Sequence, residues 1–192
     1  MLSVLRRRTP AVQRLHDELR AQGRRRSEPL RLQAAEELLQ RKITLAELIG
    51  VQLGGSGSAC AGCSVGQDGK AGCFDGGLCC SGATEVVFAK SEIAALALTG
   101  TRPRDCIPSG EDAGCAFRGA RGCVLDVRHR PSVCVHYICR DLMREVSEEG
   151  VVAEVVVAQD RLREAMEVFS RLNGQSQADE EFAELFPAPR RP

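Results

Sequence analysis

The sequence predicts a mainly α-helical protein with little β structure, in which helices flank a loop-rich core held together by its cysteines. Three observations lead to this prediction. Helical periodicity occupies both ends of the 192-residue chain. All ten cysteines lie between Cys60 and Cys139. Aromatic residues make up 4% of the chain and Trp is absent, so we expect something besides a hydrophobic interior to stabilise the middle.

The first helix is predicted just after the basic N-terminus. Thr9 can cap it, Pro10 suits its first position because an amide there would have no partner, and Gly23 is placed to end it. Its apolar residues recur at helical spacing: Val12, Leu15 and Leu19. We therefore expect this face of the helix to be buried.

Two further helices are predicted before the cysteines, and together with the first they make a helical segment over residues 1–55. Ser27 and Pro29 open one of them. Its apolar stripe is Leu32, Ala35, Leu38 and Leu39. The sequence TLAE at Thr44–Glu47 has the form of a capping box and predicts another helix, which runs to Leu53 and ends at the following glycine pair. The stretch GGSGS then predicts a flexible hinge.

The second predicted unit covers residues 56–145 and contains every cysteine. The sequence TEVVFAK, at 84–90, is rich in β-branched residues and predicts a short strand. The sequence SEIAALALTG predicts a helix that Ser91 caps and Gly100 closes. Gly, Pro, Asp and Arg are frequent over residues 101–128, so we expect mostly loop there.

The C-terminal part is predicted as a helix over residues 146–174 that packs on the core. The sequence GVVAEVVVAQ fits either a strand or the start of a helix, because it is β-branched but unbroken. The sequence QDRLREAMEVFSRLNG is helical in pattern and has an end signal at Asn173 and Gly174. Its apolar side is Leu162, Ala165, Met166, Phe169 and Leu172. Residues 175–192 are acidic and end in prolines, so we expect an acidic mobile tail.

The chain is expected in the cytoplasm. Its first residues include arginines but no following apolar run of signal-peptide length, and no stretch reaches about 18 apolar residues, so no membrane association is predicted. A reducing cytoplasm keeps thiols free, and a cysteine framework there more often holds metal than disulfides. We therefore predict a metal core ligated by cysteines.

Charge is balanced overall, with 26 basic and 26 acidic side chains, but it is unevenly distributed. Residues 1–59 carry 11 basic and 6 acidic side chains, whereas residues 140–192 carry 7 and 12. A basic end can bind nucleic acid, and the sequence RKITLAELIGVQLGG could belong to a helix-turn-helix. We expect solvated helical faces instead, because acids interrupt the basic residues and aromatic residues for base stacking are missing.

The spacing of the cysteines separates two kinds of metal site. A zinc ribbon needs two C-x2-C pairs, and in this sequence Cys60 and Cys63 alone have that form. The other gaps are irregular, which fits an iron–sulfur cluster whose ligands come from scattered loops. A 4Fe-4S cluster is therefore the first expectation and zinc the second. The side chains of adjacent Cys79 and Cys80 diverge in an extended segment, so they need not bind the same ion.

The sequence RPSVCVHYIC, at 130–139, predicts how one cysteine is presented. Pro131 begins a helix and puts Cys134 in the first turn, where free amides and the helix dipole stabilise a thiolate. If that helix continues to Cys139, the two cysteines lie about 140° apart around its axis. They would then not share a mononuclear site.

Other polar residues of the sequence have more than one interpretation. Arg130 adds positive charge beside the cysteine or simply pairs with Glu92 or Asp126. Cys106 can be a ligand, a free thiol or a redox-active cysteine. A ligand or proton-donor role is considered for His136 and Tyr137, although packing is the plainer interpretation, and solvated side chains are expected for His16 and His129.

The order of LCC, SEIAALA, GCAF and GCVLDVRHRPSVC along residues 73–139 resembles the bacterial zinc- or iron-chelating cysteine-cluster family often called YkgJ-like. The resemblance depends chiefly on RPSVC and the cysteines before it. It implies that a metal is ligated by Cys79, Cys80, Cys115, Cys123 and Cys134, with Arg130 and Pro131 as a structural signature. The family typically opens with a compact C-x2-C-x2-C-C run, which this chain lacks. The upstream Cys73, Cys60 and Cys63 are therefore further candidate ligands, and Cys139 is also kept as a candidate.

These observations together predict a cytoplasmic metal-binding protein with a redox, metal-handling or enzyme-supporting role. Its expected partner is the metal ion or cluster, and a protein partner is possible. Binding to nucleic acid is not expected. The alternative is a metal-sensing regulator that binds DNA through the basic N-terminal helices. No nucleophile and base pair and no phosphate-binding loop occurs at recognisable spacing, so the sequence leaves open whether the protein is an enzyme.

Overall fold

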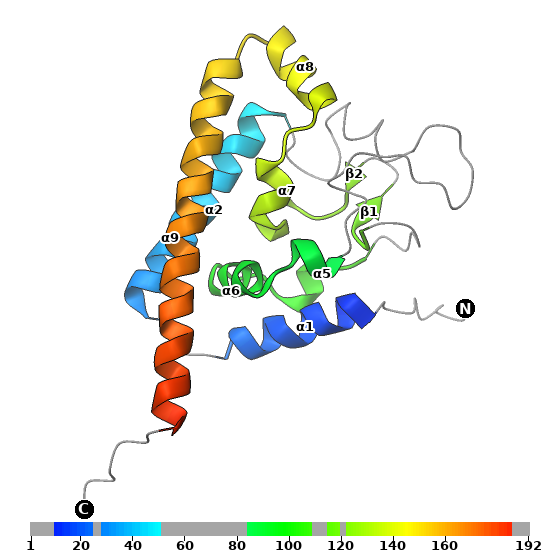
Figure 1. The fold of residues 1–192 in the computed structure, drawn as a ribbon. Helices are drawn as coiled ribbons and strands as arrows, with labels where there is room; N and C mark the ends of the chain where they lie inside the picture. Colours follow the sequence, from blue (N-terminus) through cyan, green and yellow to red (C-terminus); the bar gives the residue numbers. More distant parts are fainter. Residues whose placement is uncertain (1–9, 25–27, 51–83, 109–114, 120–121, 186–192) are drawn as a thin grey trace, which may run out of the picture.

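The computed structural model confirms a mainly helical protein with little β structure (Figure 1). The described residues are 10–24, 28–50, 84–108, 115–119 and 122–185. Within them, the strands are two residues each and the other regular elements are helices. None of the helices in these ranges is long and apolar enough to cross a membrane.

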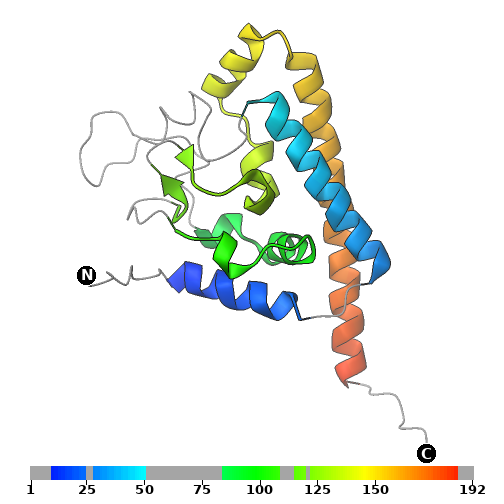
Figure 2. The ribbon, with the colours of Figure 1, turned by 180° about the vertical axis from the view of Figure 1, so that it is seen from behind.

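Helix α1 (Pro10–Gln22) confirms the first predicted helix and its buried face. Val12, Leu15 and Leu19 are all buried. The Gly23 amide donates to the Leu19 carbonyl at 3.0 Å, which closes the last turn where the sequence predicts it. In both ribbon views α1 lies beside α5 and α6 (Figures 1 and 2).

Helix α2 (Pro29–Leu48) is continuous, so the prediction of a separate helix starting at Thr44 was wrong. The Thr44 hydroxyl donates to the Gln40 carbonyl at 3.1 Å, a bond to the preceding turn that a threonine can make inside a helix. The helix ends at Leu48, Ile49 is its C-cap, and Gly50 follows with a φ of 65°. The expected end at residues 54–55 lies outside the described part of the chain.

The continuity of α2 also removes the turn that a helix-turn-helix would need within RKITLAEL. The predicted stripe is otherwise confirmed, because Ala35 and Leu38 are buried and Leu32 and Leu39 are half-buried. Helix α2 packs mainly against α9 (Val152–Leu185).

Residues 84–87 form helix α5 (Thr84–Val87), so the predicted strand was wrong. The Phe88 amide donates to the Thr84 carbonyl at 3.0 Å, which closes the single turn. Within the described residues, strand pairing is confined to β1 and β2, so no neighbouring strand is there to pair with this segment. Helix α6 (Lys90–Leu98) is confirmed, but Ala89 occupies its N-cap in place of Ser91.

The stretch after α6 is mostly loop, as predicted. Two one-turn 3-10 helices interrupt it, at Pro103–Asp105 and Val127–His129. Strands β1 (Arg118–Gly119) and β2 (Gly122–Cys123) form a short antiparallel hairpin, in which Arg118 pairs with Cys123. This hairpin carries Cys115 and Cys123 near its ends.

Helix α7 (Ser132–His136) starts directly after Pro131, as predicted, but ends before Cys139. Cys139 instead occupies the N-cap of α8 (Arg140–Glu148), where its Sγ accepts a hydrogen bond from the Leu142 amide at 3.4 Å. The expected single helix through Cys139 was therefore wrong, and the angle of about 140° between the two cysteines does not apply.

Helix α9 begins at Val152, so the sequence GVVAEVVVAQ is the start of a helix and not a strand. It runs through Asn173 and Gly174 to Leu185, so the predicted end at Gly174 was wrong, as was a tail starting at residue 175. A glycine inside a helix costs about 1 kcal/mol, which the helix-forming residues around it can outweigh.

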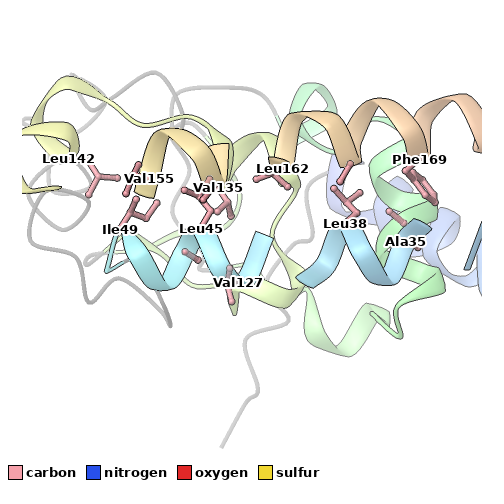
Figure 3. Close-up of a cluster of buried hydrophobic side chains, with 14 of the residues drawn as sticks. Ala35, Leu38, Leu45, Ile49, Val127, Val135, Leu142, Val155, Leu162 and Phe169 are labelled. Carbon is pink, nitrogen blue, oxygen red and sulfur yellow. The ribbon is translucent and has the colours of Figure 1, made fainter. Parts of the chain in front are cut away.

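Two hydrophobic clusters form the interior of the described part of the chain, and α6 contributes to both. The first cluster lies where α2 and α9 meet, with α7 and α8 at one end; it includes Leu38, Leu45, Leu162 and Phe169 (Figure 3). Ala94 and Ala95 of α6 belong to it. The second cluster supports the cysteine hairpin.

The second cluster joins α1 to the other side of α6 and to the hairpin. It includes Leu15 and Leu19 of α1, Leu96 of α6 and Phe117 before β1. The Phe88 and Phe117 rings lie 5.4 Å apart between centroids and are tilted by 60°, a favourable aromatic geometry. The small residues of AALA let α6 fit between the two clusters.

Candidate metal centre

The described part of the chain contains five of the ten cysteines. They are Cys106, Cys115, Cys123, Cys134 and Cys139. The other candidate ligands lie outside the described residues: Cys60, Cys63, Cys73, Cys79 and Cys80. Among the described side chains, no three Cys, His, Asp or Glu residues gather into a group that could hold a metal ion. The complete ligand set therefore stays a prediction.

Cys115 and Cys123 lie at the same end of the hairpin. The Arg118 amide donates to the Cys115 carbonyl at 3.0 Å, and Arg118 is paired in register with Cys123. The hairpin is tied to α5 because the Thr84 hydroxyl accepts a hydrogen bond from the Ala116 amide at 3.1 Å. The backbone around Cys115 is thus fixed by two hydrogen bonds, one from the Arg118 amide and one from the Ala116 amide to Thr84.

Arg130 connects this hairpin to the segment that carries Cys134. Its guanidinium is buried and donates from Nε to the Leu125 carbonyl at 2.8 Å and from Nη2 to the Cys123 carbonyl at 3.4 Å. Arg130 therefore binds backbone carbonyls and does not form the ion pair with Glu92 or Asp126 that one interpretation expected. A planar guanidinium can hold two carbonyls at once.

Cys134 lies in α7, and the Cys134 amide donates to the Pro131 carbonyl at 3.0 Å. Pro131 occupies the N-cap, which confirms the predicted start of this helix. Because α7 has five residues, its dipole is smaller than the sequence interpretation assumed. A positive charge on another helix also acts on Cys134.

That charge belongs to Lys42 of α2, which sequence analysis missed. Its side chain is 2% exposed, and Nζ donates to the carbonyls of Arg130 at 2.7 Å and Arg128 at 3.1 Å. Burial lowers the Lys42 pKa from 10.5 to about 8, although the negative charges of Glu92 and Cys134 oppose this shift. The position of Lys42 between buried Leu38 and Leu45 was the available signal.

Glu92 of α6 holds the same segment from another side. Its Oε2 accepts a hydrogen bond from the Ser132 amide at 2.9 Å. Burial raises the Glu92 pKa, while this hydrogen bond and the charge of Lys42 lower it. Glu92 of α6 thus holds the first residue of α7, and Lys42 of α2 holds the backbone just before this helix.

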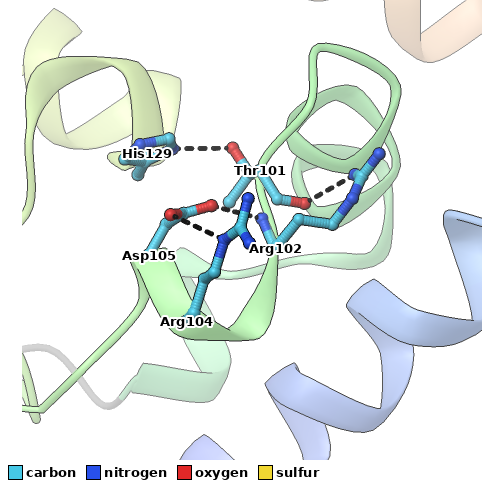
Figure 4. Close-up of polar contacts among 5 residues, drawn as sticks. All are labelled: Thr101, Arg102, Arg104, Asp105 and His129. Carbon is cyan, nitrogen blue, oxygen red and sulfur yellow. Dashed lines mark hydrogen bonds and ion pairs between the residues drawn. The ribbon is translucent and has the colours of Figure 1, made fainter.

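Two histidines expected in solvent are instead bonded to the protein. His16 is buried, and its Nε2 lies 2.8 Å from the Cys106 carbonyl oxygen. The Nδ1 of His129 lies 2.9 Å from the hydroxyl of Thr101, which is buried (Figure 4). Beside them, the Arg102 amide donates to the Asp105 carboxylate at 2.8 Å (Figure 4). The expected solvation of His16 was therefore wrong, whereas His129 is half-buried and bonded to one hydroxyl.

His136 and Tyr137 have less definite roles. His136 is half-buried and its backbone carbonyl accepts a hydrogen bond from the Gln159 side chain at 2.9 Å, which attaches α7 to α9. Tyr137 is 40% exposed. Neither residue acquires a ligand role from these contacts.

Cys106 is a buried residue of the second hydrophobic cluster. Burial raises the pKa of its thiol from 9.0 to about 12, and the nearby Asp105 carboxylate adds to the shift. Of the three interpretations left open by the sequence, a free thiol fits this environment best, because a thiolate is the form that binds metal and reacts.

Cys106 is expected to reduce stability at alkaline pH. From pH 9 to 12 the unfolded thiol ionises while the folded thiol keeps its proton, so the free energy of unfolding falls by about 1.4 kcal/mol per pH unit. Urea unfolding of the reduced protein and of Cys106→Ala measures this contribution. The difference between the two proteins should shrink by about 1.4 kcal/mol between pH 8 and 10.

The alanine variant is the control for every other titrating group. Lys42 acts in the opposite direction, because its folded pKa lies below its unfolded value and stability therefore rises through this range. That contribution is present in both proteins and cancels. Parallel pH profiles for the two proteins would show that Cys106 ionises normally.

Comparisons of the chain with protein-family models, with curated proteins and with solved structures find no match.

Proposed function

We propose that the protein binds a metal centre through cysteine thiolates, with an iron–sulfur cluster of the 4Fe-4S type as the first candidate and zinc as the second. The observation that carries this proposal is the bridge made by Arg130. This buried side chain bonds the Cys123 carbonyl and lies at the start of the helix that carries Cys134. Two predicted ligands are therefore presented from backbone segments that one residue holds together.

The donors suit a metal of this kind. Thiolates are preferred by iron–sulfur clusters and by structural zinc. The cationic side chains of Lys42 and Arg130 favour the ionised form of a nearby thiol, and the Lys42 charge acts on Cys134. Cys115, Cys123 and Cys134 are the described candidates for the ligand set, although these three do not form a metal-holding group in this structure. The remaining ligands would come from the cysteines of residues 60–80, with Cys79 and Cys80 first among them.

The positions of these residues support a cluster over a zinc ribbon. A ribbon presents its thiolates as two C-x2-C pairs, whereas Cys115, Cys123 and Cys134 belong to a hairpin and a separate helix. Iron–sulfur clusters accept ligands from scattered elements. A bound cluster would supply one-electron transfer, and a bound zinc would supply a structural cross-link. The role in the cytoplasm would be redox chemistry, metal handling or support of an enzyme.

The Cys134→Ser variant is expected to lose most of the metal. Serine keeps the size but replaces a soft thiolate with a hard hydroxyl that stays protonated near neutral pH. Cys139→Ser is the matched control, because a serine can cap α8 as Cys139 does and is a good N-cap residue. The measurement is the metal content per chain after anaerobic purification, with the visible absorption spectrum to separate iron–sulfur from zinc.

The wild-type protein and the two variants are purified in parallel, and circular dichroism confirms that all three are folded. Metal in the wild type and in Cys139→Ser, with loss in Cys134→Ser, supports the proposal. Equal loss in both variants would contradict the assignment of Cys134 over Cys139. A folded wild-type protein that takes up neither iron–sulfur nor zinc would refute the function itself.

A further inference from the structure

We propose that a pocket between α5, α6, α7 and α9 binds a primary ammonium group at the end of a short aliphatic chain. The pocket has a volume of about 210 Å³. Sites for drug-sized ligands are usually larger, at about 300–1,000 Å³, so this pocket suits a smaller molecule or a single side chain. None of the described residues that line it is a cysteine, so the inference does not depend on the proposed metal centre.

Most of the pocket wall is apolar. Leu38 of α2 and Phe169 of α9 line it, together with Met166, whose flexible side chain can adapt to the shape of a ligand. Val86 of α5 and Val133 of α7 also line it and are 74% and 40% exposed, so the apolar wall reaches the protein surface. A short alkyl chain in the pocket would remove this apolar area from water, which favours binding.

The polar side chains that line the same pocket are Ser91, Glu92 and Ser170. Glu92 is the only ionisable side chain among the described lining residues. A carboxylate and two hydroxyls can all accept hydrogen bonds, and a primary ammonium has three N–H donors and no acceptor. The ammonium therefore matches these groups in charge and in hydrogen bonding, whereas an anionic ligand would meet the negative charge of Glu92.

The Glu92 carboxylate is held in position, but no cation is bonded to it within the described part of the chain. Its Oε2 accepts a hydrogen bond from the Ser132 amide at 2.9 Å. The ammonium of Lys42 instead donates to the carbonyls of Arg128 and Arg130. Burial keeps the Glu92 pKa above its ordinary value although the charge of Lys42 lowers it, so a further cation would stabilise the ionised carboxylate.

The first test compares three ligands on the full-length protein at pH 7, where an aliphatic amine is protonated. Pentylammonium is titrated and the backbone amides are followed by NMR, with saturable shifts expected at Ser91, Val133 and Ser170. Pentanol keeps the chain without the charge, and pentyltrimethylammonium keeps the charge without N–H donors. Each should bind about 10-fold more weakly, because a hydrogen bond between charged groups is lost.

The same ammonium group can belong to a free amine or to a lysine side chain of another protein. N-acetyl-lysine methylamide presents it as a polypeptide does, and it is titrated beside pentylammonium. Tighter binding of the lysine compound would identify a protein lysine as the source. Tighter binding of pentylammonium would identify a free aliphatic amine.

Three variants test where the ligand binds and what selects it. Glu92→Gln keeps an acceptor for the Ser132 amide but removes the charge, so the preference for pentylammonium over pentanol should disappear. Ser170→Leu places a larger apolar side chain at an exposed lining position and should weaken both ligands about 10-fold. Glu167→Gln removes an exposed acid of α9 that does not line the pocket and should match the wild type. Circular dichroism confirms that each variant is folded.

The ligand comparison on the wild type decides the inference even if Glu92→Gln does not fold. Pentylammonium that gives no saturable shift, or that shifts exposed acidic residues throughout the protein instead of the pocket, would overturn it. Equal binding of pentylammonium and pentanol would show that the carboxylate does not select the ligand, which overturns it as well. Binding that survives unchanged in folded Ser170→Leu would place the ligand outside this pocket and contradict the inference.

Discussion

Replacing Phe169 with alanine is expected to lower the free energy of unfolding by about 3–5 kcal/mol, the usual cost of truncating a buried aromatic residue. Phe169 is 1% exposed and lies in the first hydrophobic cluster, where α9 faces Leu38 and Ala35 of α2 (Figure 3). Removing the ring takes away buried apolar area and leaves a space that the two helices fill only in part. Urea unfolding followed by circular dichroism measures the change.

Val168→Ala is the control for this substitution. Val168 is the adjacent residue of α9 and is 42% exposed, so its truncation should change stability by no more than about 0.5 kcal/mol. A similar loss in both variants would mean that α9 does not present the Phe169 face to α2. The arrangement of the first cluster would then be wrong.

Arg130→Met is expected to lower the free energy of unfolding by about 2–4 kcal/mol. The change leaves the Leu125 and Cys123 carbonyls without the charged donor that they bond to, and each such bond contributes about 1.5–3 kcal/mol when its geometry is good. The bond to Cys123, at 3.4 Å, is the weaker of the two. Urea unfolding of the reduced protein measures the loss of stability, and metal content is measured in the same preparations.

Two further variants test the reason for this effect. Arg128→Met removes an exposed arginine two residues earlier and should leave stability within about 0.5 kcal/mol of the wild type. Arg130→Lys keeps the charge but lacks the planar fork, so it should recover only part of the loss. Full recovery by lysine would show that charge alone matters at this position, against the two-carbonyl contact in the structure.

Helical periodicity was the most informative part of the sequence. Val12, Leu15 and Leu19 of α1, and Leu162 and Phe169 of α9, were predicted as buried and are buried. These predictions succeed because an amphipathic helix must turn its apolar stripe towards some other element, whichever element that is. The predicted start of α7 after Pro131 was also confirmed, since proline restricts the local backbone.

Local signals misled where tertiary packing outweighed them. The capping box at Thr44 lies inside α2, because packing against α9 keeps the helix continuous. The β-branched residues 84–87 form a turn of helix, since α1 and the hairpin provide contacts there but no strand to pair with. Gly174 lies within α9, where its cost is small compared with the length of helix on both sides.

The sequence by itself determined the helical class, the positions of α1 and α6, and the buried face of α9, although not the bounds of α9. Three hydrogen bonds were decided by the tertiary structure alone. They join Lys42 to the Arg130 carbonyl, Glu92 to the Ser132 amide, and His16 to the Cys106 carbonyl. These contacts join residues 88, 40 and 90 positions apart. The physical reason is that helical periodicity depends on residues close together in the sequence. A polar contact between distant segments forms only when the packing of apolar faces has brought their helices together.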